Sequence, residues 1–167
     1  NRNAFILENF IIDATNAVNR DDSWDPNAAI FKTVSSDLTI SDVYLANISA
    51  YATNQQGSKD GGAAAALVAC IWDPTSQSWN PKPKTLTLKG NITLDQSAPS
   101  LLDDDRKQIL GSAAAGGLIG RVGSPYRTDN YFALADGTLV LKENCNVRIN
   151  GHMLVNSVGD SRNAGYY

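Results

Sequence analysis

The sequence predicts a mainly β protein, an antiparallel β-sandwich or jelly-roll-like fold with one short helix near residues 100–110. Apolar residues alternate with polar ones in many short segments, which is the pattern of half-buried strands. Clusters of Asn, Asp, Gly, Ser and Pro separate these segments and are typical of turns. Charged residues make up only 19% of the chain. The neutral polar residues that replace them suit turns and short strands better than long surface helices.

Charge and hydropathy exclude several classes of protein. The net charge is −3 and the pI is about 5.0, whereas a domain that binds duplex nucleic acid or an anionic membrane normally has a basic face. A membrane-spanning helix needs about 18 or more consecutive apolar residues, and the sequence has no such run. We therefore expect neither nucleic-acid binding nor membrane insertion. The chain begins with Asn and without a secretory signal, so we expect a processed protein or a piece of a larger one.

The N-terminal segment fits two patterns. A heptad seam would consist of Leu7, Phe10, Ala14 and Ala17. In short strands, Phe5 and Leu7 would instead share one face of the first strand, and Phe10 and Ile12 would share one face of the next. The Phe and Ile content favours strands, while the heptad pattern would provide a short trimerising segment.

Further strands are expected at 29–34, 38–52 and 85–94. Within 38–52 the apolar residues move from odd positions, as at Val43, to even positions, as at Ile48, which predicts a bulge or a corner. Residues 63–72 are predicted to be a buried strand or a short core helix. Their four alanines favour helix, and the glycines before and β-branched residues after them favour strand.

The best helix signal covers residues 99–111. Ser100 can cap its start, three Asp residues precede Arg106 and Lys107, and Gly111 can end it. The Gly- and Ala-rich stretch that follows predicts a hinge or a close-packed connection. We therefore divide the chain into a β-rich domain at 1–98, a helix and connection at 99–123, and a β segment at 124–167 that completes the same domain or begins a second.

The stretch 144–157, NCNVRINGHMLVNS, raises the question of whether its Asn-Gly forms a hairpin turn. A hairpin at Asn150-Gly151 would place His152 and Asn156 on the inward side. A continuous strand instead separates the apolar from the polar positions. We therefore predict one long strand in which Gly151 marks a close approach or a local bend.

The residues that could react chemically do not form a recognisable motif. His152 is the only histidine, and no nucleophile-elbow or zinc-ligand spacing accompanies it. The three Asp residues at 103–105 are contiguous, unlike the alternating ligands of a calcium loop. Cys70 and Cys145 match no metal or redox motif, and we expect two buried thiols, with a disulfide as the alternative. The sequence thus predicts no catalytic residue, no metal and no cofactor.

The three tryptophans are more informative, because each is followed by Asp or Asn and then Pro. Asx-Pro pairs initiate turns, so each Trp is expected where a segment enters a turn. Exposed rings beside amides and carboxylates would form a surface on which a sugar can stack. The candidate ligand-binding residues are Trp24, Asp25, Trp72, Asp73, Gln77, Trp79 and Asn80. The alternative is that the rings close the ends of the core.

The run FALADGTLVLKENCNVRINGHMLVNS, residues 132–157, resembles the strand pair of C1q- or TNF-like jelly-roll heads, in which an apolar strand, a turn and a long alternating strand follow one another. Such heads occur in phage receptor-binding and fibre proteins. The resemblance implies a homo-oligomer, with a trimer favoured. The long strand lacks the usual aromatic residue and has Val147 in its place.

Two functional hypotheses follow. The first is a non-enzymatic structural or attachment domain of a larger assembly, such as a viral capsid, a phage appendage or a fibre, located outside the cell or on the virion surface and binding a receptor. The second is a stand-alone carbohydrate-binding module that uses the exposed tryptophans, so that a glycan is the partner.

Overall fold

The computed structural model describes residues 5–14, 18–21, 27–52, 62–71, 84–97, 107–111, 114–122, 137–151 and 153–157. In these ranges the chain is built from β-strands that form four sheets, A to D. The chain passes through A, B, C and D in turn and then starts again in A, so each circuit is one coil of a stack. Every pairing between described strands is parallel. This architecture is a parallel β-helix.

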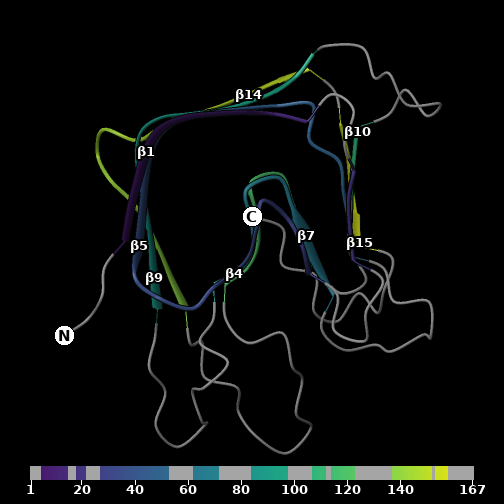
Figure 1. The fold of residues 1–167 in the computed structure, drawn as a ribbon, viewed down its shortest axis with the longest axis horizontal. Coiled ribbons are helices and arrows are strands. Elements are labelled where there is room, and N and C mark those ends of the chain that lie inside the picture. The colour runs from purple at the N-terminus through teal and green to yellow at the C-terminus, as the bar shows by residue number, and fades with distance from the viewer. Residues whose placement is uncertain are drawn as a thin grey trace, which may run out of the picture.

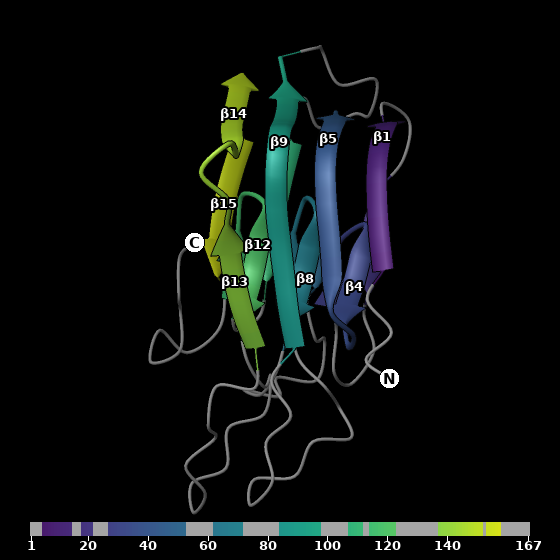
Figure 2. The ribbon, with the colours of Figure 1, turned by 90° about the vertical axis from the view of Figure 1, so that its left-hand side faces the viewer.

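Sheets A and B form two outer walls (Figure 1). Sheet A contains β1 (Phe5–Asp13), β5 (Leu38–Ala46), β9 (Lys84–Gln96), β13 (Gly137–Leu141) and β14 (Asn146–Gly151). Its strands lie side by side in Figure 2, with both β13 and β14 next to β9. Sheet B contains β2 (Asn19–Asp21), β6 (Ala50–Ala52), β10 (Lys107–Gly111) and β15 (Met153–Ser157).

Sheets C and D complete each coil. Sheet C contains β3 (Asn27–Ala28), β7 (Ala63–Ala65) and β11 (Ala114–Gly116). Sheet D contains β4 (Phe31–Val34), β8 (Val68–Ile71) and β12 (Ile119–Val122). The short corners between C and D also pair between coils, because the N–H of Phe31 donates to Leu67 O and the N–H of Leu67 donates to Leu118 O.

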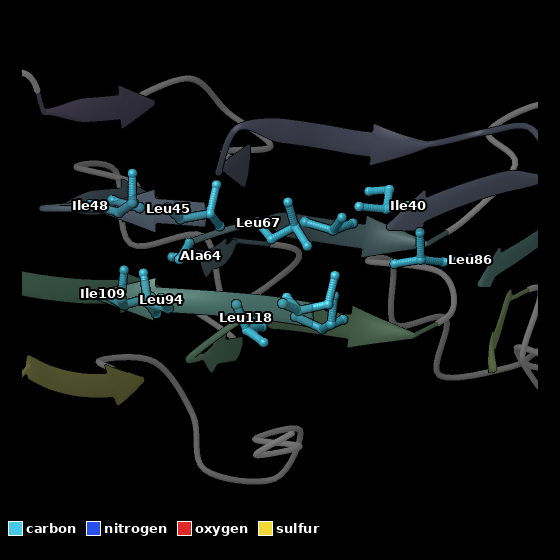
Figure 3. Packing of buried hydrophobic residues seen from close by; sticks show 14 of the residues in the cluster. Ile40, Leu45, Ile48, Ala64, Leu67, Leu86, Leu94, Ile109 and Leu118 are labelled. Carbon is cyan, nitrogen blue, oxygen red and sulfur yellow. The ribbon is translucent and has the colours of Figure 1, made fainter. Parts of the chain in front are cut away.

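The core consists of apolar side chains stacked in register from coil to coil. Sheet A supplies four inward rows: Phe5–Leu38–Leu86–Leu139, Leu7–Ile40–Leu88–Leu141, Phe10–Val43–Ile92–Val147 and Ile12–Leu45–Leu94–Ile149. The members from β9 are buried, and Leu67 and Leu118 belong to the same core cluster (Figure 3). Each buried leucine or isoleucine contributes about 1.5–3 kcal/mol through removal of its surface from water.

A stacked bulge bends sheet A near its middle (Figure 1). Asn9, Asp42 and Gly90 all have φ near +60°, and the register of β5 against β9 shifts between Ser41 and Val43. A side chain at position 90 would meet the Asp42 carboxylate, because an added Cβ would lie 2.4 Å from Asp42 Oδ1. The bulge therefore needs a residue that tolerates the left-handed conformation in each of the first three coils, and a glycine where the space is smallest.

Small residues are needed where sheets C and D pack together. A second core cluster consists almost entirely of alanines: Ala29, Ala63, Ala65, Ala69, Cys70 and Ala114. The backbones approach closely here, since a Cβ added at Gly120 of β12 would lie 2.9 Å from Ala64 O of β7. The run of alanines at 63–66 therefore forms β7 and the start of the corner that leads to β8, rather than the core helix that was its alternative.

The prediction of a mainly β fold is confirmed, but the described strands do not pair as an antiparallel sandwich or jelly roll. Antiparallel pairing is absent among the described strands. Alternation of apolar and polar residues defines the two faces of a strand, but it does not indicate whether the neighbouring strand runs parallel or antiparallel. The first strands of successive coils begin at Phe5, Leu38, Lys84 and Gly137, so the coils differ in length and no fixed repeat is visible in the sequence.

The prediction of a helix near residues 100–110 is wrong for the last part of that range. Residues 107–111 form β10, which pairs with both β6 and β15, and Ile109 is fully buried. Tertiary pairing thus overrides the helix signal at this end, while residues 98–106 lie outside the described residues. The Gly- and Ala-rich residues that follow supply β11 and β12 to sheets C and D, and the last segment supplies β13, β14 and β15 to sheets A and B.

The N-terminal segment is a strand, as the alternation at Phe5 and Leu7 and at Phe10 and Ile12 predicted. Asn9, with φ 56°, is the bulge between these two alternating stretches. The parity change before Ile48 is a corner, since β5 ends in sheet A and β6 begins in sheet B. Both predictions are therefore confirmed.

Asn150-Gly151 is not a hairpin turn, because β14 pairs with β9 and β15 pairs with β10. The prediction of one long strand is nevertheless wrong, since the chain turns a corner there. Gly151 has φ +83°, and an added Cβ would lie 2.5 Å from the Gln96 carbonyl carbon, so it combines a bend with a close approach. The Gln96 side chain fixes the corresponding corner of the preceding coil. Its Oε1 accepts a hydrogen bond from the Ile48 N–H at 2.8 Å, and its Nε2 donates to Ile48 O at 2.7 Å.

Replacing Ala65 with leucine is expected to destabilise the protein by about 1–3 kcal/mol or more, because the layer between sheets C and D has no room for a longer side chain. Urea unfolding followed by circular dichroism measures the effect. Thr138→Leu, at an exposed position of β13, is the control and should change stability by less than about 0.5 kcal/mol. Equal stability of the two variants would contradict the close packing.

Candidate functional site

The ligand-binding residues suggested by the sequence lie outside the described residues: Trp24, Asp25, Trp72, Asp73, Gln77, Trp79 and Asn80. The topology still fixes the strands from which their segments leave. Residues 72–83 join β8 to β9, and residues 123–136 join β12 to β13. Because β8 pairs with β12 and β9 with β13, these two insertions start and end on neighbouring strands. Residues 22–26 join β2 to β3 and so belong to a different corner of the coil.

A polar hollow lies beside the bend of sheet A, at the C-terminal end of the stack. It has a volume of about 510 Å³ and is lined by Asn91, Thr93, Cys145, Asn146, Val147 and Arg148. Strand β9 and the segment that enters β14 meet here, although they are far apart in the sequence. Two carboxamides, a hydroxyl and a guanidinium provide the donors and acceptors that a polar ligand such as a sugar requires.

Next to this hollow, Asp95 is held by three hydrogen bonds. The Tyr44 hydroxyl donates to Asp95 Oδ2 at 2.8 Å, and the Ser97 N–H donates to Oδ1 at 2.9 Å. The Ser97 hydroxyl also donates to Oδ1 and is the main reason why the pKa of Asp95 is lowered. The same arrangement raises the pKa of Tyr44, because its proton is shared with a carboxylate. Asp95 is therefore an ionised acceptor, unsuited to act as a general acid near neutral pH.

An apolar hollow lies at the opposite end of the stack. It has a volume of about 250 Å³ and is lined by Phe5, Leu7, Phe31, Thr33, Val34, Ser35, Ser36 and Leu38. Strands β1 and β4 of the first coil form its sides. Phe5 is 53% exposed and Leu7 37% exposed, although both occupy inward rows. The hollow is thus the uncovered end of the core.

The two cysteines are free thiols in different surroundings. Cys70 is buried in β8, and its thiol lies 3.4 Å from Asn27 Oδ1. Burial raises the pKa of Cys70 to about 11, and the nearby Arg121 guanidinium opposes this shift without cancelling it. Cys145 is half-buried, and burial raises its pKa as well. Neither thiol has the depressed pKa of a nucleophilic cysteine, and the prediction of a buried thiol is confirmed fully only for Cys70.

Within the part of the chain that the structure describes, no three His, Cys, Asp or Glu side chains gather as metal ligands. No helix in that part is long and apolar enough to cross a membrane. His152 falls between β14 and β15, outside the described residues. The described groups can offer hydrogen bonds and apolar contact to a partner.

Sequence reasoning missed both hollows, because each is formed by strands from different parts of the chain. One signal was present for the polar hollow: Asn146 and Arg148 belong to the outward set of the stretch 144–157. Nothing in the sequence pairs them with Asn91 and Thr93, which lie on the neighbouring strand only because β14 stacks in parallel on β9.

The coils define this chain as a parallel β-helix protein whose described surface has a hollow at each end of the stack. Comparison with protein-family models, with curated proteins and with solved structures gave no match.

Asp95 should make the protein sensitive to acid. Its pKa is lower in the folded state, so it contributes stability above the usual carboxyl pKa, and this contribution is lost as the pH falls through the lowered value. We expect Asp95→Asn to flatten the stability profile between about pH 5 and pH 2, measured by thermal unfolding. Asp42→Asn is the comparison variant, with a carboxylate that accepts one backbone bond, from Asn91. An unchanged profile for Asp95→Asn would show that its three bonds do not contribute.

The thiols should differ in their reaction with iodoacetamide at pH 8. Cys145 is accessible and is expected to be alkylated in the native protein, whereas Cys70 should react only after unfolding. Intact mass spectrometry should therefore show a single addition, and none for Cys145→Ser. Two rapid additions, or a mass that indicates a disulfide, would contradict the placement of β8.

Proposed function

We propose that this chain is a non-enzymatic structural and attachment domain of a larger assembly, of the kind found in a viral capsid, a phage appendage or a fibre. The observation that carries the proposal is the exposure of apolar side chains at both ends of the stack. Phe5 and Leu7 are exposed at the first coil, and Val147 and Ile149 are 46% and 47% exposed at the last. Their row neighbours Leu88, Ile92 and Leu94 are buried. Large exposed apolar surfaces of this kind mark sites of protein association.

The open edges of sheet A support the same proposal. Among the described strands, only β5 pairs with β1, and only β9 pairs with β13 and β14. An exposed, apolar edge strand of nine residues is a template for pairing with another chain. The contacts within the assembly would therefore be apolar and backbone-mediated. A homo-oligomer and a location outside the cell or on the virion surface belong to this proposal.

Receptor contact is assigned to the insertions between sheets D and A. Insertions in a stacked-coil protein protrude from one side of the stack and are a frequent place for binding. Residues 72–83 carry Trp72 and Trp79 together with Asp73, Gln77 and Asn80, so a glycan can be bound there by ring stacking and by hydrogen bonds. Trp24 and Asp25 lie in an insertion at another corner and are expected to contribute less.

The second candidate function is a stand-alone carbohydrate-binding module. The polar hollow favours it, because Asn91, Thr93, Asn146 and Arg148 present hydrogen-bonding groups suited to sugar hydroxyls. In this case the protein would bind glycans as a monomer.

Sedimentation equilibrium combined with tryptophan fluorescence distinguishes the two functions. An attachment domain is expected to form oligomers, and its binding to a glycan array should fall by on the order of tenfold or more in Trp72→Ala or Trp79→Ala, because a buried aromatic anchor contributes about 2 kcal/mol. Trp24→Ala, in the insertion at another corner, is the comparison variant and should reduce binding less than either of the other two. A monomer at all concentrations, with fluorescence quenched by glycan, would support the binding module instead.

A further inference from the structure

The two free edges of sheet A carry the two ends of the same residue rows. Strand β1 begins each inward row, and β13 and β14 end it. The row that starts at Leu7 ends at Leu141, and the row that starts at Ile12 ends at Ile149. Inside the stack these rows are buried by the next coil, whereas Leu7 is 37% and Leu141 58% exposed. Each edge therefore presents apolar residues at the positions where the other edge would need them in a neighbouring coil.

We propose that a second copy of this chain docks head to tail, with its β1 pairing in parallel with β13 and β14 of the first copy. This inference rests on the proposed function and names its partner. Continuing the register by one strand sets the following residues of the two copies opposite each other: Phe5 and Leu139, Leu7 and Leu141, Phe10 and Val147, Ile12 and Ile149. Every inward pair is apolar, as it is between coils within one chain.

The outward positions match as well. Ile6 would lie opposite Val140, and Ile11 would lie opposite Arg148, whose aliphatic stem can cover it. Ile6 is 64% and Ile11 76% exposed, because both point away from the core of their own chain. A neighbouring strand in this register gives both side chains an apolar contact.

Charge complementarity fixes the same register. Glu8, Ser41 and Lys89 form one outward row. The N–H of Lys142 donates to Leu88 O at 3.0 Å, so Lys142 extends this row next to Lys89. Two lysines on adjacent strands repel each other, and an acid beside Lys142 relieves this repulsion. Glu8 of the second copy reaches this place in the same alignment that pairs the apolar rows.

The apolar hollow provides space for the contact. Phe5 and Leu7 line it at the free edge of the first coil, and the exposed Leu141 of the other copy would sit against Leu7. Sheets C and D have three described strands each, whereas sheet A continues to β13 and β14 and sheet B to β15. Sheets A and B therefore face the second copy, and sheet A carries the matched apolar rows. The two surfaces differ, so the interface is heterologous and propagates into a linear stack rather than closing as a dimer.

Two variants in one row test the proposal by sedimentation equilibrium. Leu7→Lys blocks the head, and Leu141→Lys blocks the tail. Each variant alone is expected to be monomeric, because a lysine then faces a leucine across the contact. An equimolar mixture should contain dimers, since the free tail of one variant meets the free head of the other. Thr39→Lys, on the outer face of β5, is the control and should associate like the wild type.

A charge exchange at exposed positions provides a second test that does not touch the core. Glu8→Lys and Lys142→Glu should each weaken association about two- to fivefold, and the double variant should restore it. Circular dichroism verifies that every variant is folded.

The outcomes separate this inference from the proposed function. A closed oligomer that Leu7→Lys and Leu141→Lys leave intact, or that Thr39→Lys disrupts, would overturn head-to-tail docking while the attachment function stands. A wild-type protein that stays monomeric, or a mixture without dimers, would also overturn the docking. Loss of glycan binding in the Trp72 and Trp79 variants tests the receptor contact of the proposed function independently of association.

Discussion

In-register stacking of apolar side chains between parallel coils is the interaction on which the rest of this structure depends. Leu94 shows the principle, because it lies between Leu45 of the coil before and Ile149 of the coil after and is fully buried. A coil has no complete core of its own, since its side chains are covered by the coils on either side. The first and last described coils are covered on one side only, and the inward residues Phe5, Leu7, Leu141, Val147 and Ile149 are exposed there.

Stacking also determines which residues the corners and bends require. A conformation needed in one coil recurs at the same place in the next, so positive φ angles occur in register at Asn9, Asp42 and Gly90. The close approach of sheets C and D likewise demands small side chains in every coil, which accounts for the alanines and glycines at 63–66 and 114–117. Segments between strands are under no such restriction. The insertions between sheets D and A therefore have room for residues that serve binding.

The sequence was sufficient for features that depend on neighbouring residues along the chain. It predicted the strand character of β1 and the corner before Ile48, because both change the side-chain alternation locally. Strand direction and the hollows depend on which distant strands become neighbours, as Asn91 and Asn146 do, and alternation carries no such information. The helix signal at 99–111 failed at Ile109 because pairing with β6 and β15 outweighs local propensity. The candidate tryptophans remain a prediction, since the strands fix only where their segments begin and end.

The parallel register of β5 and β9 is the central claim, and backbone NMR tests it most directly. Nuclear Overhauser effects between amide and α protons report which residues lie opposite each other. The structure predicts contacts of Ile40 with Leu88 and of Leu45 with Leu94, in the same order along both strands. Contacts that run in opposite order, with Leu45 near Leu86 and Ile40 near Leu94, would show an antiparallel sheet and contradict the stacked coils.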